Sequence, residues 1–64
     1  MNYDWLHSEI CKLINRVEND SNATEFLDRW NFITDVETND IRFLARDEAV
    51  KLFFDLINYV GDYH

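Results

Sequence analysis

A chain of 64 residues can enclose only one small hydrophobic core, and this limit is the strongest constraint on its fold. A domain of this size buries about 60% of the surface that its unfolded chain exposes, which leaves little room for a second domain or a catalytic cleft. One cysteine excludes an internal disulfide, and one cysteine with two histidines does not supply the usual four soft ligands of a structural zinc site. We therefore expect a single domain spanning residues 1–64, without a cofactor, a metal or enzymatic activity, whose stability comes from packing or from a partner.

The charge of the chain is concentrated in its middle third. Six Lys and Arg residues against thirteen Asp and Glu residues give a formal net charge of −7. Residues 1–17 carry two acids and two bases, and residues 41–64 carry four acids and three bases. In residues 18–40, Arg29 is opposed by seven acids: Glu18, Asp20, Glu25, Asp28, Asp35, Glu37 and Asp40. Because a surface of this sign repels phosphates and attracts basic groups, we expect a basic protein partner and no direct contact with nucleic acid.

The sequence shows no pattern typical of export or of membrane insertion. No basic segment precedes an apolar run near the first residue, and no apolar run exceeds three residues. Signal peptides and membrane-spanning helices both require much longer apolar runs. Together with the single thiol, this favours the reducing cytoplasm and no membrane partner.

Two helices are predicted in the first half of the chain. The first begins near Asp4, whose side chain can accept hydrogen bonds from the backbone N–H groups of the first turn. Its apolar residues recur at steps of three and four and form one stripe that faces the core: Leu6, Ile10, Leu13, Ile14 and Val17. Asn22 and Glu25 match the spacing of a capping box, which predicts a second helix from Ala23 to about Trp30. The predicted buried face of this second helix consists of Phe26, Leu27 and Trp30.

Residues 31–46 admit two interpretations. If they are helical, Ile41, Leu44 and Ala45 form a stripe that is rotated by roughly 100° from the stripe that starts at Ala49, so one straight helix does not explain both. A β-hairpin around residues 37–40 instead pairs Asp35 with Arg42 and places Phe32, Thr34, Val36, Ile41, Phe43 and Ala45 on its inner face. We predict the hairpin. The expected fold class is therefore α+β, with a helix, a short helix, a β-hairpin and a C-terminal helix; an all-α three-helix bundle is the alternative.

The last helix is predicted to start with Asp47 as its cap and to end at Gly61. Its apolar side chains cover about 200° of its circumference, which is wider than the roughly 100° stripe of an ordinary surface helix. Either the hairpin and the first helix both cover it, or part of it meets another chain. The second possibility makes the protein a structural or adaptor subunit that homodimerises through Val50, Phe54, Ile57 and their neighbours.

His7 and Cys11 are the residues with the greatest chemical reactivity. They lie four residues apart on the first helix, one turn after Asp4, and could form a nucleophile with its base or, as a trio, three metal ligands. The same residues also fit a helix cap, a histidine at the core boundary and a small buried thiol. Because no third residue that would orient the histidine and no oxyanion hole can be identified, we assign no catalytic or metal site here.

The acidic middle of the chain is the best functional candidate. Its carboxylates can meet Lys and Arg of a partner, while nearby aromatics supply affinity; those that a single apolar stripe explains least well are Trp5, Trp30, Phe32 and Phe54. The predicted partner-binding residues are Trp5, Phe32 and Phe54 with Glu18, Asp20, Glu25, Asp28, Asp35, Glu37 and Asp40. The sequence thus favours a non-enzymatic inhibitor that occludes a basic, nucleic-acid-binding surface of another protein. In size and acidity, though in no motif, the chain is similar to small inhibitors encoded by phages and plasmids, including anti-CRISPR proteins, and to nuclease immunity proteins.

Overall fold

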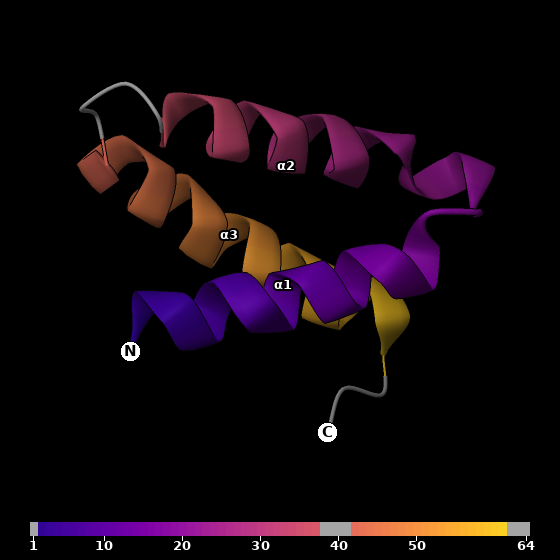
Figure 1. The fold of residues 1–64 in the computed structure, drawn as a ribbon. Coiled ribbons are helices and arrows are strands. Elements are labelled where there is room, and N and C mark those ends of the chain that lie inside the picture. The colour runs from indigo at the N-terminus through magenta and orange to yellow at the C-terminus, as the bar shows by residue number, and fades with distance from the viewer. Residues whose placement is uncertain (1, 38–41, 62–64) are drawn as a thin grey trace.

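The described part of the chain is a bundle of three α-helices. A computed structural model describes residues 2–37 and 42–61, except for the side chains of residues 42 and 43. The helices are α1 (Tyr3–Val17), α2 (Thr24–Val36) and α3 (Arg42–Val60), and a short 3₁₀ turn, η1 (Ser21–Ala23), precedes α2. α1 and α3 run in the same general direction and α2 runs against them (Figure 1). α3 packs against both other helices and is therefore the centre of the fold.

The predicted apolar stripe of α1 is confirmed, whereas its predicted cap is wrong. Leu6, Ile10, Leu13, Ile14 and Val17 are all buried in the core. The capping residue is Asn2, whose side-chain oxygen accepts hydrogen bonds from the backbone N–H of Asp4 at 2.8 Å and of Trp5 at 3.4 Å. Asp4 lies inside the first turn, where its negative charge still interacts favourably with the positive end of the helix dipole.

α2 is longer than predicted and begins differently. It continues past Trp30 to Val36, with Ile33 and Val36 buried and Phe26, Leu27 and Trp30 packed against the core. The predicted capping box is wrong, because no side chain caps the start of α2. Asp20 instead accepts a hydrogen bond from the backbone N–H of Asn22 at 2.9 Å and so caps the preceding turn η1.

The predicted β-hairpin, and with it the α+β fold class, is wrong; the three-helix alternative fits the structure. Residues 32–36 belong to α2, residues 42–46 belong to α3, and no strand occurs in residues 2–37 and 42–61. Most of the predicted turn at 37–40 lies outside the described residues. The physical reason is the position of Ala45. It precedes Ala49 by four residues and lies in phase with Leu52 and Leu56, so its fully buried side chain extends the later stripe backwards.

α3 ends as predicted but begins earlier. Its first residue is Arg42, so Asp47 lies within the helix and does not cap it. Gly61 terminates the helix with a φ of 76°, and its N–H donates to the Ile57 carbonyl at 2.9 Å. The wide apolar arc of α3 is covered by α1 and α2 together, but Phe54 remains 53% exposed.

Candidate functional site

The outward face of α2 collects three of the predicted acids around one predicted aromatic. The side chains involved are all exposed: Glu25, Asp28, Phe32 and Asp35. They follow one another at intervals of three, four and three residues, which places them within about 80° of the helix circumference. The side of α2 that carries Phe26, Trp30 and Ile33 packs in or against the core, whereas none of the four residues of this outward stripe belongs to the core cluster. We call these four residues the α2 stripe.

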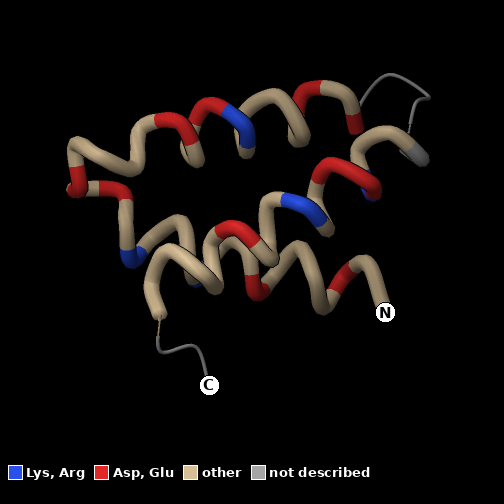
Figure 2. The backbone as a smooth tube through the Cα atoms, turned by 180° about the vertical axis from the view of Figure 1, so that it is seen from behind, with Lys and Arg blue, Asp and Glu red and all other residues tan. Residues whose placement is uncertain are grey.

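The one base in the acidic segment does not lie on the α2 stripe. Arg29 extends towards α3, where its guanidinium Nη1 lies 2.8 Å from Oδ2 of Asp55. Acidic positions follow α2 and the turn before it, whereas α1 and α3 each carry as many bases as acids (Figure 2). Phe32, which is 51% exposed, therefore lies in strongly negative surroundings.

Asp20 accepts two hydrogen bonds that stabilise the fold. Its carboxylate caps η1 and also accepts a hydrogen bond from the hydroxyl of Tyr59 near the end of α3. These bonds favour the charged form, so the Tyr59 hydroxyl and the Asn22 N–H hold the pKa of Asp20 below its usual value. The same bond raises the pKa of Tyr59, because it stabilises the neutral phenol. Asp20 thus connects the start of α2 to the end of α3.

Glu37 has a similar structural role at the other end of the bundle. It follows α2 directly and accepts a hydrogen bond from the hydroxyl of Tyr3 on α1. Its second oxygen lies 3.8 Å from His7 Nε2, a contact that becomes an ion pair when the imidazole is protonated. Burial, followed by the hydrogen bond to Glu37 and the charge of that residue, raises the pKa of Tyr3 above its usual value. Glu37 thus ties the end of α2 to the start of α1.

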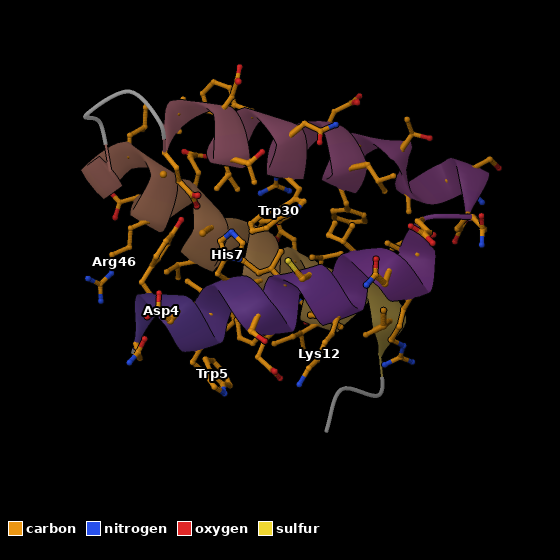
Figure 3. All side chains as sticks on the ribbon, viewed as in Figure 1. Asp4, Trp5, His7, Lys12, Trp30 and Arg46 are labelled. Carbon is orange, nitrogen blue, oxygen red and sulfur yellow. The ribbon has the colours of Figure 1, made fainter. Side chains whose placement is uncertain are left out.

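The structure therefore does not gather the ten predicted partner-binding residues into one site. Glu18 caps the C-terminal end of α1 and is exposed. Asp40 lies outside the described residues. Trp5 is 47% exposed and points away from α2 (Figure 3). Phe54 lies with Trp5, since both rings flank Phe53 at centroid distances of 5.9 and 5.6 Å.

His7 and Cys11 approach one another without forming a recognisable reactive site. The Cys11 thiol lies 3.8 Å from His7 Nδ1, and the imidazole packs edge-on against Trp30 at 4.7 Å, between α1 and α2 (Figure 3). Asp4 is exposed, and the carboxylate that lies beside His7 is that of Glu37. Within residues 2–37 and 42–61, no three His, Cys, Asp or Glu side chains converge in a way that could hold a metal ion.

Sequence reasoning missed three side-chain pairs that join different helices or their ends. Tyr3 and Glu37, Tyr59 and Asp20, and Asp55 and Arg29 are separated by 34, 39 and 26 residues respectively. No local spacing identifies pairs so distant in sequence, because they depend on how the helices pack.

Comparison with protein-family models, curated protein sequences and solved structures finds no match to this chain. None of the helices in the described part of the chain is long and apolar enough to cross a membrane. The described residues define a class: a small bundle of three α-helices in which the exposed face of α2 is strongly acidic.

Proposed function

We propose that the protein is a non-enzymatic inhibitor that binds a basic, nucleic-acid-binding surface of a partner protein through the α2 stripe. The observation that carries this proposal is the helical phase of α2, which brings Glu25, Asp28 and Asp35 to the same exposed face as Phe32. The stripe combines a charge that attracts basic side chains with an apolar ring that can enter a pocket between them.

The spacing of the carboxylates suits a surface that normally contacts phosphates. Glu25 and Asp35 are ten residues apart, which is about 15 Å along a helix. One strand of duplex DNA carries a phosphate about every 3.4 Å of axial rise, so it presents about four phosphates over the same length. The three carboxylates of the α2 stripe can therefore take the place of several phosphates on a partner and exclude nucleic acid by competition.

Phe32 provides the part of the affinity that salt does not weaken. A half-exposed phenylalanine on a rigid helix loses little conformational freedom on binding, and burial of its ring contributes to affinity independently of charge. The surrounding carboxylates accelerate the encounter and select basic partners. We place this interaction in the cytoplasm, where the single Cys11 thiol would stay reduced.

The test is capture of a partner from the native host on the immobilised chain, followed by competition with duplex DNA and RNA. We expect the captured protein to release nucleic acid as it binds the chain, and its affinity for the chain to fall steeply between 0.1 and 1 M salt, where the screening length drops from about 10 to about 3 Å.

Two variants and a control locate the surface. Asp28→Lys should weaken capture by about tenfold or more, because it replaces an attraction with a repulsion at the centre of the stripe. Asp4→Lys, at an exposed position on α1, makes the same change in net charge and should leave capture nearly unchanged. Phe32→Ala should weaken capture by roughly 2 kcal/mol without changing its dependence on salt. An affinity that does not fall between 0.1 and 1 M salt, or capture that Asp28→Lys and Asp4→Lys weaken equally, contradicts the proposal.

A further inference from the structure

A second surface, on the side of α1 that Trp5 faces, is formed by aromatic rings from two helices. Trp5 of α1 and Phe54 of α3 are each about half exposed, at 47% and 53%. Phe53, which is 4% exposed, contacts both rings and lies edge-on to Trp5 at an interplanar angle of 77°. These three rings, which we call the aromatic centre, are thus connected by ring contacts across α1 and α3.

The helices that carry the aromatic centre are electrically balanced, in contrast to α2. α1 contains two acids, Asp4 and Glu9, and two bases, Lys12 and Arg16. α3 contains three acids and three bases, whereas α2 carries Glu25, Asp28 and Asp35 against Arg29. Two copies of a chain with a net charge of −7 repel each other least when they approach through α1 and α3.

Two charged residues, one on each helix that carries the aromatic centre, have a self-complementary order. Lys12 lies seven residues after Trp5, and Asp47 lies seven residues before Phe54, so each is two turns and about 10.5 Å from its aromatic and on the same side of its helix. Because α1 and α3 run in the same direction (Figure 1), the base lies at one end of the aromatic centre and the acid at the other.

We propose that a second copy of this chain binds here, with a two-fold axis through the aromatic centre. Such an axis brings identical patches together in opposite directions, so Lys12 of each copy faces Asp47 of the other. Lys12 has a largely exposed side chain, at 71%, and already approaches Glu9 of its own helix at 3.0 Å; Asp47 is exposed. The two-fold arrangement buries Trp5 and Phe54 of both copies against one another and forms two pairs of opposite charges at its edges.

The size of the aromatic centre indicates a weak and reversible dimer. Trp and Phe bury 150–250 Å² when fully enclosed, so four half-exposed rings remove roughly 400 Å² from water. Stable complexes bury about 1,200–2,000 Å² in total, which is about three to five times this area. Association is therefore expected to depend on concentration.

The first experiment measures mass by sedimentation equilibrium from about 10 µM to 1 mM protein. The expected result is a rise from 7.8 kDa towards twice that value with increasing concentration. Phe54→Ala should keep the chain monomeric throughout. Phe32→Ala removes an equally exposed ring from α2 and should leave the dimer intact. A monomer at 1 mM, or equal effects of the two substitutions, overturns the proposal.

The second experiment tests the register with a charge exchange. Lys12→Glu and Asp47→Lys should each raise the dissociation constant about fivefold or more, because each places like charges together at two symmetric positions. The double variant restores both pairs with their signs exchanged and should regain most of the affinity. If the double variant associates more weakly than either single one, or if neither single variant has an effect, the two-fold arrangement is wrong. Helical circular dichroism of each variant confirms that the monomer is folded.

Discussion

The adjacent residues Ile33 and Phe32 provide the most direct test of the fold, because helix and hairpin assign them opposite environments. Ile33 is 1% exposed and Phe32 is 51% exposed in α2. In a hairpin, Phe32 would face the core and Ile33 would face solvent. Truncation of a buried isoleucine to alanine costs about 2–5 kcal/mol, whereas a substitution at a surface position usually stays within about 0.5 kcal/mol.

The loss expected for Ile33→Ala is large relative to the total stability of the domain. At about 0.05–0.15 kcal/mol per residue, a chain of this length has a free energy of unfolding of about 3–10 kcal/mol, so Ile33→Ala removes a large part of it. Ile33→Val costs about 0.5–1.5 kcal/mol and remains measurable if the alanine variant unfolds. Phe32→Ala is expected to be neutral or slightly stabilising, because alanine has the higher helix propensity.

Thermal and urea unfolding, followed by circular dichroism at 222 nm, measure these effects. A loss of 1 kcal/mol lowers the Tm of a domain of this size by about 4–8 °C, so Ile33→Val should lower the Tm by about that amount, while Phe32→Ala should leave it nearly unchanged. If Phe32→Ala proves more destabilising than Ile33→Ala, the helical assignment of residues 32 and 33 is wrong, since a hairpin predicts that order.

Three further predictions concern helix ends and the contact between Tyr3 and Glu37. Asn2→Ala should destabilise the protein by about 1 kcal/mol in urea unfolding, since α1 loses its capping side chain, and Asn2→Asp should preserve most of that stability. Gly61→Ala should cost about 1 kcal/mol by the same measurement because of its left-handed backbone, since no atom would obstruct an added Cβ; a loss far above this value would point to a steric cause instead. Because the pKa of Tyr3 is raised in the folded state, the unfolded chain loses its phenolic proton first, and stability should fall as the pH rises above about 10. Tyr3→Phe should show a smaller fall in a series of urea titrations from pH 8 to 11, and an equal fall in both proteins would contradict the assigned hydrogen bond.

The sequence was sufficient to predict α1, because five large apolar residues recur there with one helical period and no competing pattern. It was insufficient for residues 31–46, because the evidence for a helix depended on Ala45. Alanine is common at both buried and exposed positions, so the sequence does not show that Ala45 is buried. Its burial follows from the packing of α1 and α2 against α3. The hairpin pattern, with an opposite-charge pair and alternating apolar residues, was locally as consistent as the helical one.

For the candidate site, too, the sequence gives the charges but does not show which side chains lie on the same face. Counting charges along the chain locates the acidic segment, but which of its residues share a face depends on the backbone period. As a strand, Phe32 and Asp35 point to opposite sides; as a helix, they lie on one face with Asp28. Likewise, only the fold shows that Asp20 and Glu37 are engaged with tyrosines, so charge alone overestimates the number of acids available to a partner.

The energetic cost of the α2 stripe supports a role for it beyond solubility. Glu25 and Asp28 lie three residues apart on one exposed helix face, where like charges destabilise a helix by about 0.2–0.5 kcal/mol, and the exposed ring of Phe32 gains nothing from the core. A surface that served only to keep the protein dissolved could carry as many bases as acids, as α1 and α3 do. The stripe combines like charges with an exposed aromatic on the one face of α2 that the bundle does not need. Because changes there are expected to leave the core intact, a loss of partner binding in Asp28→Lys or Phe32→Ala can be assigned to the surface and not to unfolding.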